Sequence, residues 1–141
     1  MKNAAVKFDS VSFTYPESET PVFTNLDLEL PSGVVSFVGQ NGTGKSTALL
    51  LASGRVQPQV GSVTLADTRT DSITDEAERN RYASFIYQNM EFETEEPISE
   101  LFEFVYENGF HDEKDSVFLM DIIKAFELES SIKRKLQDLS K

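Results

Sequence analysis

The chain has 141 residues, enough for about one ordinary domain with its own hydrophobic core. Its 24 Asp and Glu residues outnumber 13 Lys and Arg residues, and the formal net charge of −11 argues against nucleic acid as a main partner. Cys is absent, which excludes a disulfide framework and a thiolate metal site, and the longest apolar run, residues 48–52, is too short to span a membrane. The sequence therefore predicts a soluble domain that is not exported.

The N-terminal part of the chain predicts antiparallel strands. Apolar and polar side chains alternate over residues 4–15, with a one-residue slip at Asp9 and Ser10 that indicates a β-bulge. Residues 22–30 alternate again after a turn, as expected for a second strand that pairs with the first. Residues 62–66 predict a further strand. We expect these segments to form an antiparallel β-subdomain.

A strand, a glycine-rich loop and a helix are expected next to one another. Residues 34–38 are a short Val-rich run that predicts a strand, and residues 46–53 predict a helix closed by Gly54. A phosphate-binding loop requires this order of elements. Further along, residues 75–81 predict a short helix and residues 83–87 a brief strand.

The last third of the chain predicts helices. Apolar residues recur at helical spacing after Pro97, which predicts a helix ending near Gly109, and the pattern repeats over residues 116–128. Residues 131–136 predict a third helical piece. The acidic residues in 91–96 are interpreted as a solvated face.

Residues 39–46 match the pattern G-x-x-x-x-G-K-[ST] in full. Glycine allows backbone N–H groups to converge on an anion, and the N-terminus of the following helix adds its positive dipole. Lys45 is expected to contact the β- and γ-phosphates, the Ser46 hydroxyl to ligate Mg²⁺, and Thr47 to reach another phosphate oxygen. The residues expected to bind ATP at this loop are Gly39, Asn41, Gly42, Thr43, Gly44, Lys45, Ser46 and Thr47. A glycine-rich turn without a ligand is the alternative.

Two residues outside the loop stand at informative distances from it. Tyr15 lies 24 positions before Gly39, and Gln88 lies 43 positions after Lys45, in the tripeptide Tyr-Gln-Asn. This arrangement resembles the ATP-binding cassette (ABC) ATPases. The resemblance implies that Tyr15 stacks on adenine, and that Gln88 belongs to a Q-loop and contacts Mg²⁺ and the attacking water. The resemblance thereby implies catalytic roles for Lys45 and Gln88. It also implies that Ser46 and Gln88 are ligands of the Mg²⁺ ion.

The final residues, 136–141, look like the approach to and the start of the family's LSGGQ-type signature. The resemblance implies an α/β fold: a phosphate-loop core with the antiparallel β-subdomain and Q-loop over residues 1–96, and a truncated helical subdomain over residues 97–141. The Walker B strand and its catalytic Glu, which the resemblance implies, are missing from the 141 residues. We therefore expect this chain alone to hydrolyse little or no ATP.

By this resemblance the chain is the ATP-binding subunit, or a fragment, of an ABC transporter. The implied partners are a transmembrane transporter subunit and a second ABC ATPase subunit that dimerises with this one on ATP binding. The implied location is the cytoplasm, at the inner face of a membrane. A non-transporter ABC-type ATPase and a nucleotide-sensing module without hydrolysis stay open as alternatives.

Overall fold

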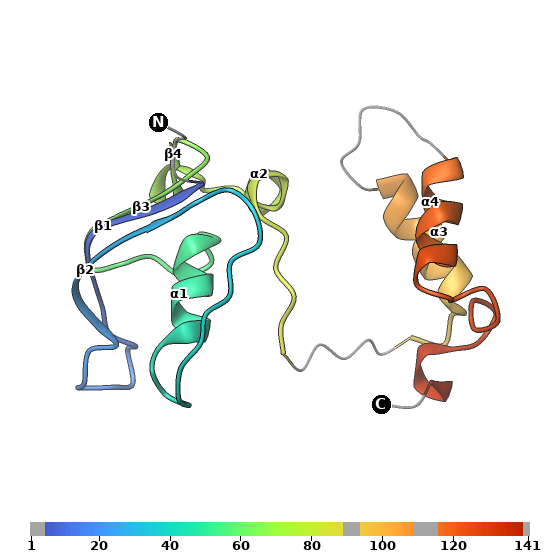
Figure 1. Ribbon diagram of the computed structural model, residues 1–141, viewed down its shortest axis with the longest axis horizontal. Helices are drawn as coiled ribbons and strands as arrows, with labels where there is room; N and C mark the ends of the chain where they lie inside the picture. Colours follow the sequence, from blue (N-terminus) through green and yellow to red (C-terminus); the bar gives the residue numbers. More distant parts are fainter. Residues whose placement is uncertain (1–4, 89–93, 109–115, 140–141) are drawn as a thin grey trace. The chain divides into compact units, whose positions relative to one another are not determined.

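The computed structural model describes residues 5–88, 94–108 and 116–139. The chain divides into two compact units, Met1–Phe85 and Ile86–Lys141, which are drawn in Figure 1. The predicted boundary between residues 96 and 97 stays a prediction.

The first unit contains a four-stranded antiparallel sheet with the strand order β2-β1-β3-β4. The strands are β1 (Val6–Phe13), β2 (Phe23–Leu30), β3 (Val60–Leu65) and β4 (Thr68–Arg69). This arrangement confirms the antiparallel β-subdomain. The two-residue strand β4 was not predicted.

Strand β1 contains the expected bulge. The β1–β2 register shifts between Phe8 and Val11, and Ser10 has a positive φ of 50°. The extra residue keeps Phe8 and Val11 on the same face of the sheet, where both are buried. The displaced Ser10 N–H donates to the Asp27 carboxylate at 2.7 Å, so the bulge leaves this donor satisfied.

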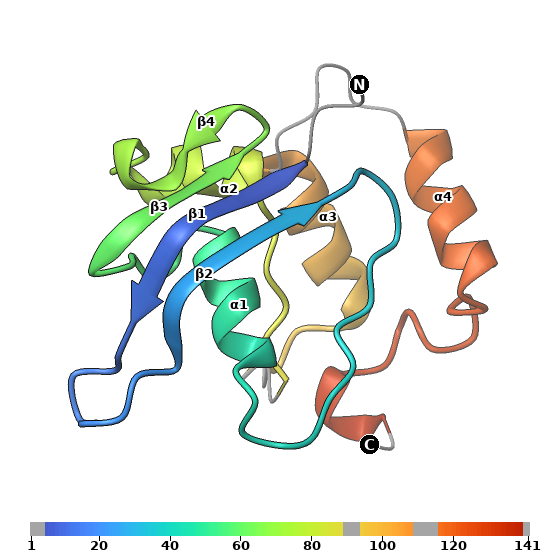
Figure 2. The same cartoon turned by 60° about the vertical axis from the view of Figure 1, so that its left-hand side comes forward.

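Helix α1 (Lys45–Ala52) lies against one face of the sheet, as Figure 2 shows. Leu51 and Ala52 from this helix join a core cluster supplied mainly by β1 and β3. The strand residues of the cluster are Phe8, Val11, Phe13 and Val63. The predicted helix over residues 46–53 is confirmed with a shift of one residue, and packing on the sheet fixes how α1 presents its N-terminus.

The remaining elements of the first unit are short. A 3₁₀ turn, η1 (Thr70–Ser72), follows β4, and helix α2 (Glu76–Tyr82) matches the helix predicted over residues 75–81. Asp75 caps α2, because its carboxylate accepts from the Glu78 N–H at 3.0 Å.

Two predicted strands do not form. Residues 34–38 and 83–87 belong to no β-ladder among the described residues. Val34 and Val38 are 102% and 94% exposed, so these side chains pack against nothing in the described part of the chain. A Val-rich run indicates a buried strand only when neighbouring strands are present to pair with it, and the described strands pair among themselves.

The second unit is helical, as expected. Helices α3 (Ile98–Asn108) and α4 (Ser116–Ala125) form where the apolar spacing predicts them, although α4 ends three residues before the predicted residue 128. Ile98 and Ile123 are buried. Gly109, the predicted end of the first of these helices, lies outside the described residues.

The helix predicted over residues 131–136 is wrong, because its backbone carbonyls are used elsewhere. The N–H groups of Ile98 and Ser99, in the first turn of α3, donate to the Arg134 and Ile132 carbonyls at 3.0 and 2.8 Å. These bonds satisfy donors that the start of a helix leaves unpaired. The segment therefore forms turns and then η2 (Leu136–Asp138).

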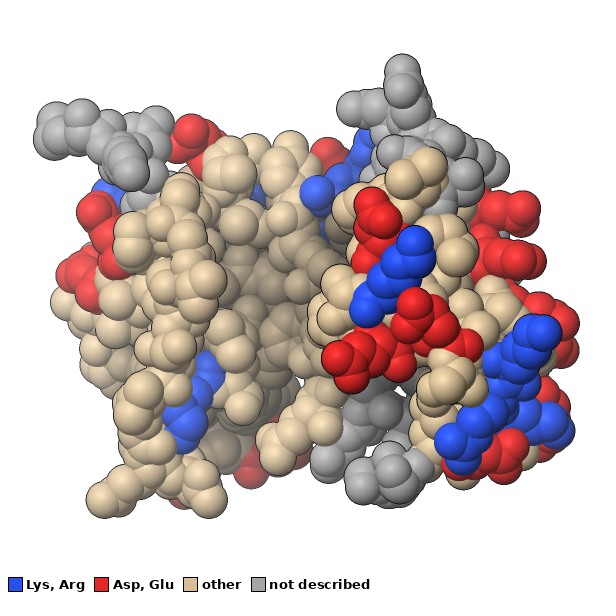
Figure 3. All heavy atoms as spheres, turned by 45° about the vertical axis from the view of Figure 1, so that its right-hand side comes forward, with Lys and Arg blue, Asp and Glu red and all other residues tan. Residues whose placement is uncertain are grey.

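No helix within residues 5–88, 94–108 and 116–139 is long and apolar enough to cross a membrane. On the face drawn in Figure 3, acidic and basic side chains lie next to one another at the right of the view, and several basic side chains gather there.

An ion pair in the second unit gives a first testable prediction. Lys135 donates to the Glu95 carboxylate, which lowers the pKa of Glu95 and raises that of Lys135. The stabilisation from the lowered pKa is present above the pKa of unfolded Glu95, and it is lost as the pH falls through the folded value. The stabilisation from the raised pKa is lost as the pH rises through the folded value of Lys135. We expect Glu95→Gln to lower the melting temperature slightly near neutral pH and less so at high salt, measured by circular dichroism.

The neighbouring Glu96 is the matched control for this substitution. A hydrogen bond with Glu96, together with its charge, raises the pKa of Glu100, so the two carboxylates disfavour each other when both are ionised. Glu96 also attracts Lys135, but more weakly than Glu95 does. Glu96→Gln therefore removes mainly a repulsion, and it should lower the melting temperature less than Glu95→Gln does. Equal destabilisation by both substitutions would contradict a specific role for the Glu95 pair.

Candidate functional site

The predicted phosphate loop leads directly into helix α1. Gly42 and Gly44 have φ angles of 84° and 87°, and Gly44 is the N-cap of α1. The Ala48 N–H donates to the Gly44 carbonyl at 2.8 Å, which closes the first turn of the helix. The unpaired N–H groups at the start of α1 therefore follow the loop immediately, and they are suited to an anion.

The Lys45 ammonium lies across the loop. It donates to the Gly39 carbonyl at 2.9 Å and to the Gln40 carbonyl at 2.6 Å. The Thr43 hydroxyl also donates to the Gln40 carbonyl, at 2.9 Å. Since an ammonium group has three N–H donors, Lys45 keeps a third donor and its positive charge for another acceptor.

Neighbouring hydroxyl groups at the start of α1 have different surroundings. Ser46 is exposed, whereas the adjacent Thr47 is buried. Asn41, which lies in the loop and has an amide instead of a hydroxyl, is also exposed. Ser46 therefore presents a hydroxyl oxygen to solvent, and Thr47 turns its hydroxyl toward the protein. The exposed hydroxyl oxygen of Ser46 suits Mg²⁺, which prefers oxygen ligands.

The structure brings Tyr15 and Thr47 together. Their hydroxyl oxygens are 3.1 Å apart, and the Tyr15 ring meets the Phe13 ring edge to face, with centroids 4.9 Å apart. These residues come from the end of β1 and from α1, which the core packing holds together. The residue expected to bind adenine therefore contacts a residue expected to bind phosphate.

Gln88 is exposed and belongs to the second unit. Its proposed roles with Mg²⁺ and water stay predictions. Asn89, which follows it, and Ser140 and Lys141 of the signature-like ending lie outside the described residues.

Two features of the site were not predicted from the sequence. A Cβ atom at Gly44 would lie 2.8 Å from side-chain atoms of Phe23 and Val22, so the β2 end of the sheet packs tightly on the loop. The Gln59 side chain binds the backbone of Thr14, next to Tyr15. Gln59 and Thr14 are 45 positions apart and match no motif, so the sequence gives no signal for this contact.

Comparison with known sequences identifies a family for most of the chain. A family model described as ABC transporter matches residues 23–141. The lipoprotein-releasing system ATP-binding protein LolD of Xanthomonas oryzae is 37% identical over 91 residues, which cover 60% of this chain and 37% of LolD. The energy-coupling factor transporter ATP-binding protein EcfA1 of Lactobacillus acidophilus is 45% identical over 58 residues, which cover 40% of this chain and 20% of that protein.

Solved structures show the same fold. The dimeric ATP-binding cassette MJ0796, in a post-hydrolysis state with ADP and Pi, matches with a TM-score of 0.72 at 23% identity. That match covers 96% of this chain and 63% of MJ0796. An ATP-binding subunit of an ABC transporter matches with a TM-score of 0.74 at 18% identity, over 97% of this chain and 56% of that one. The chain thus spans less than two thirds of each of these relatives.

Proposed function

Because residues 23–141 match its family model, this chain belongs to the ABC transporter family of ATPases, and we propose that it binds Mg-ATP to power transport across a membrane. The observation that carries the proposal is the Lys45 ammonium at the start of α1, held over a loop in which Gly42 and Gly44 adopt positive φ. The charge and the helix N-terminus together suit a triphosphate.

Mg²⁺ fits the residues present. When bound, it would neutralise part of the phosphate charge. The exposed Ser46 hydroxyl is the ligand that we propose from the loop, and the role of Gln88 at the metal stays a prediction. The Lys45 ammonium supplies a further positive charge for the phosphates, and this charge does not depend on the metal.

Tyr15 is the proposed platform for adenine. Stacking of a base on an aromatic side chain contributes about 1–3 kcal/mol, so we expect Tyr15→Ala to weaken ATP binding about fivefold to 150-fold in calorimetry with Mg²⁺. Binding of inorganic tripolyphosphate, which has no base, should be unchanged. Tyr15→Phe keeps the ring and loses only the hydroxyl contact to Thr47, so its affinity for ATP should stay close to that of the wild type.

Tyr82→Ala is the matched control, because Tyr82 is a partly exposed tyrosine on α2 in the same unit. It should leave both affinities unchanged. Loss of tripolyphosphate binding in Tyr15→Ala would indicate that the substitution damages the loop through Thr47, and it would count against the adenine role. Stacking tolerates different bases, so GTP measured in parallel tests how strongly the site selects adenine.

The names of the relatives support a transporter. LolD and EcfA1 are described as ATP-binding proteins of a lipoprotein-releasing system and of an energy-coupling factor transporter. On this proposal the whole protein acts at the cytoplasmic face of a membrane, with a transmembrane subunit and a second ATPase subunit. Co-purification of the full-length protein with a membrane subunit tests this. A full-length protein found only in the soluble fraction without such a subunit would favour a non-transporter ATPase.

A further inference from the structure

The Gln59 side chain forms two hydrogen bonds with one residue. Its amide oxygen accepts from the Thr14 N–H at 2.9 Å, and its amide nitrogen donates to the Thr14 carbonyl at 2.7 Å. The Gln59 backbone N–H also donates to the Ser12 carbonyl at 3.0 Å, in line with the pairing of Ser12 and Val60 in the β1–β3 ladder. Gln59 therefore extends the ladder between β1 and β3 beyond the last residue of β1.

The residue that this contact fixes immediately precedes Tyr15. The backbone carbonyl of Tyr15 accepts from the Ser18 N–H at 3.0 Å, so a hydrogen bond also closes the turn after Tyr15. The Tyr15 side chain itself touches Phe13 and Thr47. The Val22 N–H also donates to the Phe13 carbonyl at 2.8 Å, so it helps to order the peptide group before Thr14, whereas Gln59 binds both the N–H and the carbonyl of Thr14 itself.

We propose that Gln59 is a positioning residue for base recognition, in which its amide holds Thr14 so that the Tyr15 ring is ordered before the nucleotide arrives. The inference rests on the proposed function, because it takes Tyr15 as the base platform. A platform that is already ordered loses less conformational freedom on binding, which strengthens affinity for the base and leaves the phosphate interaction unaffected.

The chemistry requires an amide at this position. Thr14 offers one donor and one acceptor, and only a side chain with both an acceptor and a donor can satisfy the two together. In Gln59→Glu one carboxylate oxygen still accepts from the Thr14 N–H, but the other faces a carbonyl to which it cannot donate. Gln59→Ala loses both bonds.

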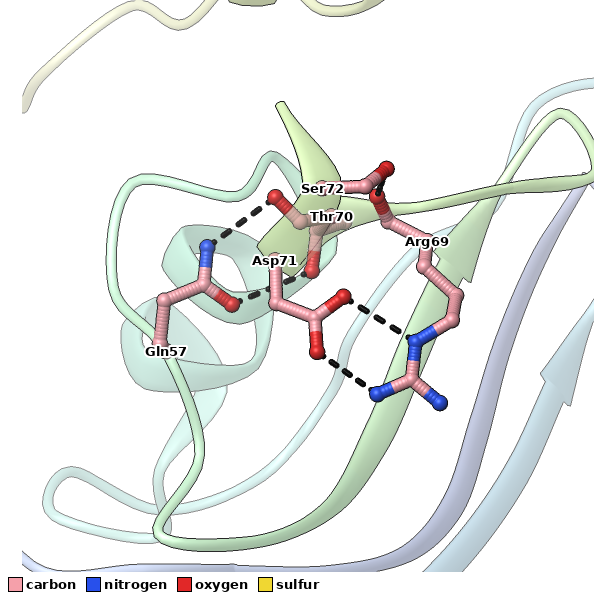
Figure 4. A network of polar contacts seen from close by, with 5 residues as sticks. All are labelled: Gln57, Arg69, Thr70, Asp71 and Ser72. Atoms are coloured by element: carbon pink, nitrogen blue, oxygen red, sulfur yellow. Dashed lines mark hydrogen bonds and ion pairs between the residues drawn. The ribbon is translucent and has the colours of Figure 1, made fainter. Parts of the chain in front are cut away.

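The same loop provides a matched control in Gln57, shown in Figure 4. Gln57 is also an exposed glutamine whose amide binds backbone, since it donates to the Thr70 carbonyl at 3.1 Å and accepts from the Thr70 hydroxyl at 3.3 Å. These bonds hold η1 and not Thr14. Gln57→Ala therefore removes a comparable amide while leaving the support of Tyr15 intact.

The test is calorimetry of Mg-ATP and Mg-tripolyphosphate binding to the whole chain. We expect Gln59→Ala and Gln59→Glu to weaken ATP binding about threefold to tenfold without changing tripolyphosphate binding, and Gln57→Ala to change neither. In the Tyr15→Ala background, Gln59→Ala should have no further effect, because Gln59 acts through Tyr15. Hydrogen exchange of the Thr14 amide should become faster in Gln59→Ala and stay unchanged in Gln57→Ala.

The outcomes separate this inference from the proposed function. Absence of ATP binding by the folded wild type overturns the proposed function and the inference with it. ATP binding that depends on Tyr15 but not on Gln59 leaves the function standing and overturns the inference. An equal loss of ATP and tripolyphosphate binding in Gln59→Ala, or an undiminished loss in the Tyr15→Ala background, means that Gln59 supports the fold in general, and that also overturns the inference.

Discussion

Replacing Lys45 by Ala is expected to weaken Mg-ATP binding about tenfold to 100-fold. Hydrogen bonds to charged groups contribute about 1.5–3 kcal/mol, and each 1.4 kcal/mol is a factor of about ten in affinity. The loss should be as large for tripolyphosphate as for ATP, because on our proposal Lys45 contacts the phosphates and not the base. Calorimetry with both ligands measures it directly.

The control for this substitution is Lys7→Ala. Lys7 lies on β1 in the same unit, 3.8 Å from the Glu29 carboxylate, and it has no contact with the loop. The Lys7→Ala substitution removes the same charge as Lys45→Ala, and it should leave the affinities for ATP and tripolyphosphate unchanged. Lys45→Arg should also bind weakly, since a planar guanidinium cannot replace the compact ammonium that fits between the Gly39 and Gln40 carbonyls. Full ATP affinity in a folded Lys45→Ala variant would overturn the assignment of the phosphate loop.

The antiparallel β-subdomain could be predicted because its signal is local. Alternation along β1 and β2 specifies which side chains face the core, and the slip at Asp9 and Ser10 marked the bulge that the structure contains. Helices α3 and α4 were predicted for the same reason, from apolar spacing within each segment.

The failures concern segments whose structure depends on distant partners. Residues 34–38 have strand composition, but a strand needs neighbours, and the described strands supply none to this segment. Residues 131–136 have helical composition, but their carbonyls bind the first turn of α3 instead. Composition within either window contains no information about these partners.

The residue types of the site were readable from the motif, whereas its contacts were not. The pattern of glycines with Lys45 and Ser46 predicts a loop before a helix, and the structure has that loop. The hydroxyl contact of Tyr15 with Thr47 depends on how α1 packs on the sheet, which spacing does not encode. The role of Gln88 stays a prediction.

Gly44→Ala is expected to destabilise the first unit strongly. At φ 87° an alanine costs about 1–2 kcal/mol of backbone strain. Its Cβ would also lie 2.8 Å from atoms of Phe23 and Val22, and overpacking of this kind costs about 1–3 kcal/mol more. Val22 is β-branched and has little rotamer freedom to move aside. Urea unfolding followed by circular dichroism should show a lower midpoint, and nucleotide binding should weaken because the start of α1 shifts.

Gly42→Ala separates the two causes. Gly42 has nearly the same φ, 84°, but a Cβ there would meet no atom within 4 Å. It should therefore lose stability only through backbone strain, and the difference between the two variants measures the steric overlap with Val22 and Phe23. Equal destabilisation by both substitutions would mean that β2 yields to the added methyl group at no cost. In that case the packing of the sheet on the loop does not hold the loop in place. The positive φ would then be the whole reason that position 44 requires glycine.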